Sequence, residues 1–152
     1  MNLFIKSTLV SVLAISVSLP SLAQNVQLTR GLEIAQARKI ADQGWTDSQA
    51  SMEMLLSNKQ GETSLRQLRM KSLEVEDDGD KSISIFDSPK DIRGAAFLTF
   101  AHVEGADDQW LYLPALKRVK RISSRNKSGP FMGSEFAYED LNSFEVEKYS
   151  YR

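Results

Sequence analysis

The sequence predicts a mainly β, α+β fold: a strongly curved antiparallel sheet, or incomplete open β-barrel, with an N-terminal helix packed against it. Helical spacing of hydrophobic residues occurs in one stretch, residues 30–45. After Gly44 the hydrophobic residues mostly alternate, and turn signals recur about every ten to fifteen residues. A chain of 152 residues is long enough for one domain of this kind.

The N-terminus has the layout of a secretory signal peptide. Met1–Lys6 carries one positive charge, Ser7–Leu19 is mostly apolar, and Pro20 ends the apolar run before small residues that favour cleavage between Ala23 and Gln24. The alternative, an uncleaved membrane anchor, fits less well because the second half of the uncharged span is polar. We therefore expect a signal peptide at 1–23, a periplasmic domain at 24–152, and peripheral rather than integral membrane contact.

Composition excludes several classes of site. The net charge of −1 does not suggest a nucleic-acid binder. With one His and no Cys, the chain has no disulfide, no lipidated cysteine and no dedicated zinc site. We expect no cofactor and no metal, and a fold held by apolar burial and sheet hydrogen bonds.

The convincing helix runs from Arg30 to Trp45, with Thr29 as its N-cap and Gly44 as its stop. Its apolar stripe predicts that one face packs on the sheet. The stripe consists of Leu32, Ile34, Ala35, Ala37, Ile40 and Ala41.

Two strands joined by a hairpin should follow the helix. Alternating apolar residues from Ala50 to Leu56 predict a half-buried strand, and the turn residues at 58–61 predict a hairpin. Thr63–Val75 is the expected return strand. Its apolar residues change parity near Ser72, which predicts a bulge or bend there.

The remaining chain continues as a meander. Asp78-Gly79 predicts a turn, because a calcium loop at 77–80 would need Gly and Glu at positions that lack them. The expected strands are Lys81–Phe86, Ala95–Val103, Gln109–Leu113, Leu116–Ile122 and Phe144–Tyr151. The last strand has no partner after it, and complete domains usually protect such an edge. We therefore expect the chain to be the N-terminal part of a longer domain.

Four segments carry a resemblance to the outer-membrane lipoprotein-sorting family, the LolA-like periplasmic lipoprotein and lipid carriers. They are Ser64–Met70 (SLRQLRM), Phe86–Thr99 (FDSPKDIRGAAFLT), Gln109–Ile122 (QWLYLPALKRVKRI) and Lys127–Leu141 (KSGPFMGSEFAYEDL). The resemblance covers essentially all of the chain after residue 23, although family members usually run on further. It implies an incomplete barrel whose apolar cavity accepts acyl chains beneath covering helices. It also implies a non-enzymatic carrier that exchanges lipoproteins with an inner-membrane transporter or an outer-membrane acceptor.

Two aromatic-bearing strands supply the candidates for a lipid cavity. Both faces of these strands are apolar, so they either line a cavity or form ordinary core between sheet and helix. The cavity candidates are Phe97, Leu98, Phe100, Trp110, Tyr112 and Leu113.

Phe131 and Met132 lie in a loop of Gly, Pro and Ser, where no periodicity forces them inward. Methionine adapts to varied partners, so the pair could form a lid or contact a partner. The alternative is simple packing over one end of the barrel.

A basic patch of six cations has no intervening carboxylate. It consists of Lys117, Arg118, Lys120, Arg121, Arg125 and Lys127. In an exported protein its partners would be anionic lipid head groups or an acidic protein surface. The alternative is a solvated strand balanced by Glu135, Glu139 and Asp140.

The sequence leaves two other functions open. A lipid ester hydrolase could be drawn from His102, Asp107 or Asp108 and a serine, but the chain has no Gly-x-Ser-x-Gly elbow. A sensor would keep the carrier fold and report lipid or lipoprotein state to an envelope-stress or exporter system.

Overall fold

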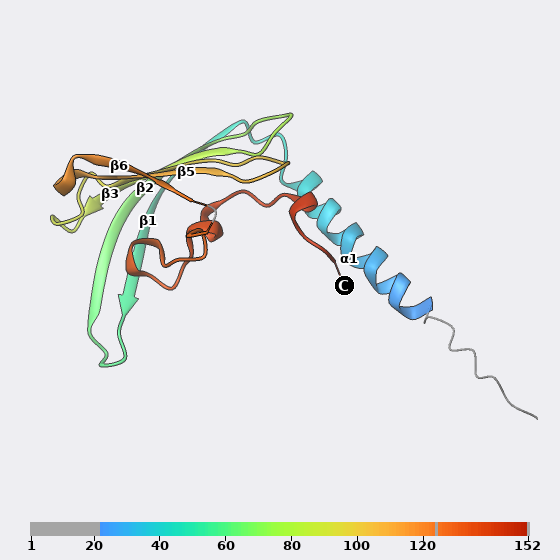
Figure 1. Cartoon of the computed structure of the whole chain (residues 1–152), viewed down its shortest axis with the longest axis horizontal. Coiled ribbons are helices and arrows are strands. Elements are labelled where there is room, and N and C mark those ends of the chain that lie inside the picture. The colour runs from blue at the N-terminus through green and yellow to red at the C-terminus, as the bar shows by residue number, and fades with distance from the viewer. Residues whose placement is uncertain (1–21, 124, 152) are drawn as a thin grey trace, which may run out of the picture.

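The computed structural model describes residues 22–123 and 125–151 (Figure 1). All but the last two residues of the expected signal peptide lie outside this range. The described chain forms one helix, α1 (Leu22–Ala41), then a six-stranded sheet, then a C-terminal segment of short 3₁₀ turns. No helix among the described residues is long and apolar enough to cross a membrane.

The sheet is an antiparallel meander in which each strand pairs with its neighbours in sequence. Its strands are β1 (Asp47–Ser57), β2 (Thr63–Leu73), β3 (Lys81–Ser88), β4 (Ala96–Phe100), β5 (Asp108–Leu113) and β6 (Arg118–Ile122). The sheet is open, with β1 and β6 as its edges, and is neither closed nor strongly curled as a whole. The expected strong curvature is therefore wrong for the described residues, although the β1–β2 hairpin bends away from the other strands (Figure 1).

The expected hairpin turn between β1 and β2 is confirmed. Oδ1 of Asn58 accepts hydrogen bonds from the backbone N–H groups of Gln60 and Glu62, at 3.0 and 2.9 Å. Gly61 closes the turn with a φ of +83°, a conformation that favours glycine.

The expected bulge lies elsewhere. The β1–β2 register is continuous past Ser72, and the irregularity falls between Gln67 and Leu68, where β2 pairs with β3. The parity change at Leu73 has a simpler cause: this side chain is exposed on the opposite face of the sheet.

Helix α1 differs from the expected helix in both its limits and its packing. It is already helical at Leu22, before Thr29, and it ends before Gly44. It packs on the C-terminal segment rather than on the sheet, where Arg38 lies over the ring of Phe144 at 4.2 Å. Its larger apolar side chains, Leu32, Ile34 and Ile40, are exposed. Part of the sheet is covered by other residues instead.

That covering comes from the C-terminal segment, residues 130–151. It contains the 3₁₀ turns η2 (Phe131–Gly133), η3 (Tyr138–Leu141) and η4 (Val146–Lys148). The expected strand at Phe144–Tyr151 is therefore wrong. Figure 1 shows the segment running beneath the sheet, on the side toward which the β1–β2 hairpin bends. We call this side the inner face and the opposite side the outer face.

Phe131 is the centre of the core. It has 0% of its surface exposed and packs with the buried residues Leu68, Phe86, Ala95, Phe97, Leu111 and Ile122. Its ring centroid lies 5.2 Å from that of Phe97, 5.9 Å from Phe86 and 5.6 Å from Tyr138. Tilted and edge-on arrangements at these distances favour aromatic pairing. Phe131 is thus the most deeply buried anchor of the C-terminal segment, and Tyr138 and Leu141 pack beside it.

Replacing Phe131 with alanine should remove this anchor. We expect the free energy of unfolding to fall by about 3–5 kcal/mol, as for other buried phenylalanines. The matched control is Phe136→Ala in the same segment, because Phe136 is 52% exposed and should change stability by less than about 1 kcal/mol. Urea denaturation followed by circular dichroism measures both; equal losses would contradict the packing described.

Candidate functional site

The six cavity candidates do not share one face of the sheet. Phe97 pairs directly with Leu111, and both belong to the buried inner face. Leu113 packs against the same core. The other four candidates alternate with these and lie on the outer face: Leu98, Phe100, Trp110 and Tyr112. Since successive side chains of a strand point to opposite faces, the two groups cannot line one cavity.

The inner face is only partly covered. Over β3 to β6 it is closed by Phe131, Tyr138 and Leu141. Over β1 it remains open, since Met52 is 44% exposed.

Four of the five methionines in the sequence lie along this boundary. Met54, Met70 and Met132 pack against the buried core, and Met52 pairs across the strands with the buried Leu68. We call Met52, Met54, Met70 and Met132 the methionine groove. The alternation of apolar residues correctly predicts that residues 52 and 54 share one face of a strand. It does not identify their methionine side chains as a candidate site.

A cavity continues from the groove toward the end of α1. It has a volume of about 590 Å³, within the roughly 300–1,000 Å³ range of ligand pockets. Trp45, Met70 and Leu141 supply its larger apolar walls. Most of the rest of its lining is polar and includes the carboxyl groups of Asp42, Asp80 and Asp140. Partial burial raises the pKa of the Asp80 carboxyl above its usual range. The cavity lies between β2, β3, the C-terminal segment and the end of the helix.

Met132 and Phe131, predicted together as a lid, have different environments. Phe131 is fully buried in the core, where its side chain is not accessible to a partner protein. Met132 is half-buried beside the groove, with a left-handed φ of +51°. Its carbonyl accepts a hydrogen bond of 2.6 Å from Nη1 of Arg66, which lies opposite Met54 in the β1–β2 pair. A lid role therefore stays a prediction for Met132 and is corrected for Phe131.

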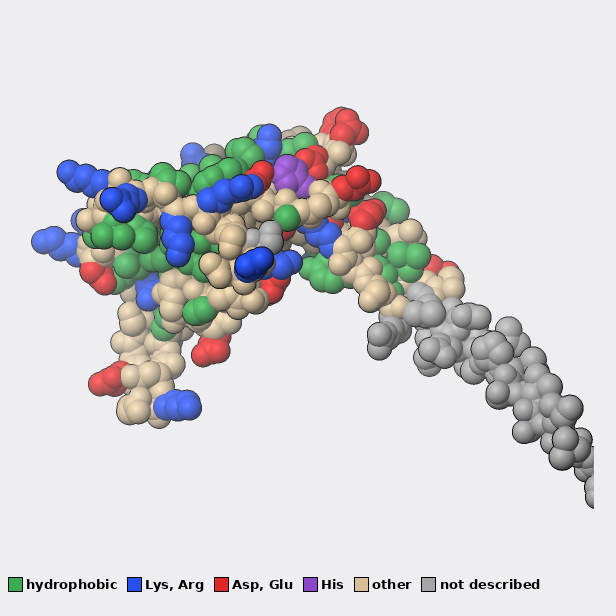
Figure 2. Space-filling model, viewed as in Figure 1, with side chains coloured by type: hydrophobic (Ala, Val, Ile, Leu, Met, Phe, Trp, Pro, Cys, Tyr) green, Lys and Arg blue, Asp and Glu red, His purple; other side chains and the backbone are tan. Residues whose placement is uncertain are grey.

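The outer face carries a continuous apolar row across three strands. Ile83, Leu98 and Trp110 are cross-strand neighbours, as are Ile85, Ala96 and Tyr112 in the next row. Phe100 meets Trp110 edge-on at 5.3 Å. These side chains are half-buried or exposed rather than closed off by another layer. In Figure 2 the upper surface shows hydrophobic side chains interspersed with lysine and arginine.

The basic patch is exposed and only partly neutralised. Arg121 pairs with Asp108, and Lys127 with Glu139 at 3.2 Å. Within 22–123 and 125–151, no ion pair involves the other four members, Lys117, Arg118, Lys120 and Arg125. Glu135 and Asp140, expected to balance the patch, do not pair with it. Along β6 the side chains alternate between faces, so the cations surround this edge of the sheet.

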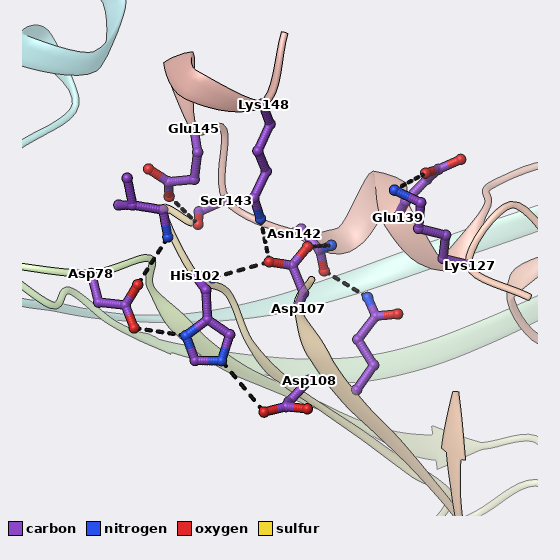
Figure 3. A network of polar contacts seen from close by, with 12 residues as sticks. Asp78, His102, Asp107, Asp108, Lys127, Glu139, Asn142, Ser143, Glu145 and Lys148 are labelled. Atoms are coloured by element: carbon purple, nitrogen blue, oxygen red, sulfur yellow. Dashed lines mark hydrogen bonds and ion pairs between the residues drawn. The ribbon is translucent and has the colours of Figure 1, made fainter. Parts of the chain in front are cut away.

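His102 belongs to a polar network that ties the sheet to the C-terminal segment (Figure 3). Its Nδ1 lies 2.7 Å from Asp78 and its Nε2 lies 3.4 Å from Asp108. The neighbouring Asp107 accepts hydrogen bonds from the backbone N–H of His102 at 3.0 Å and from Asn142 at 2.6 Å, and pairs with Lys148.

This geometry does not assemble the hydrolase drawn from the sequence. Both ring nitrogens of His102 face carboxylates, and neither contacts a serine hydroxyl in the described part of the chain. The described residues also hold no group of three or more potential metal ligands of the His, Cys, Asp and Glu types. The polar network around His102 and Asp107 is therefore explained by its structural role, which is to tie the sheet to the C-terminal segment.

The network should make stability depend on pH. The Asp78 carboxylate, followed by Asp108, raises the pKa of His102, and the His102 hydrogen bond lowers the pKa of Asp78 to about 2. Stabilisation by His102 is complete below its unfolded pKa of about 6.5 and is lost as the pH rises through its folded pKa. Stabilisation by Asp78 is complete above about pH 4 and is lost as the pH falls toward 2.

We expect the melting temperature to fall on going from about pH 6 to pH 9 and this fall to shrink in His102→Gln, because His102 is the one histidine in the sequence. Differential scanning calorimetry across this range measures the effect. Lys90→Gln, an exposed change outside the network, is the control. An unchanged pH dependence in His102→Gln would contradict the assignment.

Comparison with known proteins adds two solved relatives. The first is the crystal structure of a "putative outer membrane lipoprotein-sorting protein domain" from Vibrio parahaemolyticus, with 70% sequence identity and a TM-score of 0.78, covering 81% of this chain and 52% of that one. The second is a DUF1329 family protein from Desulfovibrio piger, with 29% identity and a TM-score of 0.74, covering 82% and 53%. A family model described only as an uncharacterised protein matches residues 78–152. No curated protein matches.

The chain spans about half the length of both solved relatives. Across that half, the high identity and shared fold with the first relative confirm the resemblance seen in the strand and loop motifs. The chain therefore belongs to the family of outer membrane lipoprotein-sorting protein domains.

Proposed function

We propose that this protein is a periplasmic carrier in outer-membrane lipoprotein sorting and that it binds acyl chains in the methionine groove. The name of the Vibrio relative and the signal-peptide pattern of the sequence support the location and the pathway. The inner face supports the site. This replaces the cavity expected between sheet and helix, because α1 does not cover the sheet.

The observation that carries the proposal is the open half of the inner face. Met52 and Met54 lie there, and Met70 joins them to a cavity of about 590 Å³, at the point where the C-terminal segment stops covering the sheet. Unbranched thioether side chains adapt to ligands of different shape. Each methylene moved from water into such a groove stabilises the complex by about 0.8 kcal/mol, which offsets the cost of moving an acyl chain through water.

Carriage of this kind is passive and needs no catalytic residue. Loading would come from an inner-membrane transporter and unloading from an outer-membrane acceptor, each favouring one state of the carrier. The Met132 side chain would adjust to cargo, since it is half-buried in the groove while Arg66 holds its backbone carbonyl. Phe131 would keep the segment anchored while Met132 moves.

Fluorescence of Trp45 tests the site. In a Trp110→Phe background Trp45 is the one remaining tryptophan, and it lines the cavity. Dibromostearate, a fatty acid whose bromines quench tryptophan on contact, should quench it saturably. Met52→Gln should raise the dissociation constant about fivefold, which corresponds to about 1 kcal/mol of lost apolar contact.

The matched control is Leu55→Gln. Leu55 is on the same strand, is 65% exposed, and lies on the outer face. It should leave the dissociation constant unchanged. Equal effects of Met52→Gln and Leu55→Gln, or the absence of saturable quenching, would contradict acyl binding in the groove.

A further inference from the structure

We propose that the outer face of the sheet is a docking surface for an anionic lipid membrane. The surface is the outer patch, formed by Ile83, Ile85, Leu98, Phe100, Trp110 and Tyr112. It lies on the opposite side of the sheet from the methionine groove, so the two sites can be tested separately and the proposal does not rest on acyl carriage.

The outer patch has the composition of a membrane interface. Tryptophan and tyrosine concentrate at the level of lipid headgroups, where an apolar ring and a polar tip are both solvated. Here Trp110 and Tyr112 stand on one strand, two residues apart, among aliphatic side chains of β3 and β4. Their partial exposure leaves apolar surface available for burial in a bilayer interface.

The charges beside the patch are complementary to anionic lipids. Lys71 flanks Ile83 directly, and Lys81 pairs across the strands with Phe100, with its ammonium 5.0 Å from the ring centroid. Two carboxylates of the outer face, Asp87 and Asp108, already pair with Arg69 and Arg121.

At the other edge of the sheet, the outer face of β6 carries Val119 and Arg121, and Arg121 already pairs with Asp108. The unpaired Arg118 and Lys120 lie opposite Leu113 and Leu111 and so belong to the inner face. The carboxylates of the outer face that lack an ion pair within the described residues, Asp47 and Glu53, lie on β1, and Asp47 reaches the hollow beside Lys71. The cations available to an anionic lipid at the apolar patch are thus Lys71 and Lys81.

A shallow hollow marks where a headgroup would bind. It measures about 260 Å³ and is lined by Leu73, Ile83 and Leu98, with Lys71, Lys81 and one carboxylate, Asp47, among its polar residues. An apolar floor with two ammonium groups against one carboxylate suits a phosphate and its first methylenes. A second copy of the protein is a poorer occupant, because two such faces would bring like charges together.

The β1–β2 hairpin bends away from the outer face, toward the inner side (Figure 1). It therefore leaves the patch accessible to a flat surface. Docking by this face would point the methionine groove away from the bilayer, where a partner protein could reach it.

Vesicle binding tests the proposal with Trp110 as a local reporter. The Trp45→Phe variant keeps Trp110 as its one tryptophan. We expect it to bind vesicles of 30% phosphatidylglycerol in phosphatidylcholine, with a blue shift of Trp110 emission, and not vesicles of pure phosphatidylcholine. Each added change, Lys71→Gln or Lys81→Gln, should weaken binding by about fivefold. High salt should do the same.

Lys59→Gln and Lys90→Gln are the matched controls, since both lysines are exposed and lie in turns off the patch. They should leave vesicle binding unchanged. Four results would overturn the proposal: no binding to the anionic vesicles, binding without a Trp110 shift, equal binding to neutral vesicles, or equal losses in the control and patch variants. Failure of acyl binding at Trp45 would leave these results unaffected.

Discussion

The burial of Phe131 is the interaction on which the rest of the structure depends. A six-stranded open sheet with apolar residues on both faces needs another layer on at least one of them. Helix α1 does not supply it, because its apolar side chains are mostly small or exposed. The C-terminal segment does so by inserting one aromatic ring among Phe86, Phe97 and Tyr138. The Asp107 and His102 contacts then fix the segment at the far end of the sheet.

This arrangement divides the molecule into surfaces with different properties. Where the C-terminal segment covers the inner face, the strands form ordinary core. Where it stops, the methionine groove and its adjoining cavity are left open. The outer face receives no second layer from the described chain and keeps aromatic residues beside lysines. In the function we propose, the inner face would serve cargo and the outer face the membrane.

Sequence reasoning identified most of the sheet because period-two patterning and turn residues are local signals. Asn58 to Gly61 and the Asp78-Gly79 turn stand where they were expected. Alternation of apolar residues does not show which face of a sheet another segment will cover. The sequence therefore predicts one cavity for Phe97 and Trp110, although they point to opposite sides of the sheet. The residues around Val146 and Tyr149 have strand composition, yet Val146–Lys148 form a 3₁₀ turn that packs against α1. The partner of α1 was equally non-local, since Phe144 and Glu145 lie more than a hundred residues further along the chain.

Photocrosslinking would test the central claim most directly. A palmitate analogue with a diazirine on its acyl chain would be bound to the protein, irradiated, and located by peptide mass spectrometry. The account predicts adducts on the segments that carry Trp45, Met52 to Met70 and Met132 to Leu141. Adducts confined to the outer-face residues of β4 and β5, or spread evenly over the chain, would show that the inner face is not the acyl-binding site.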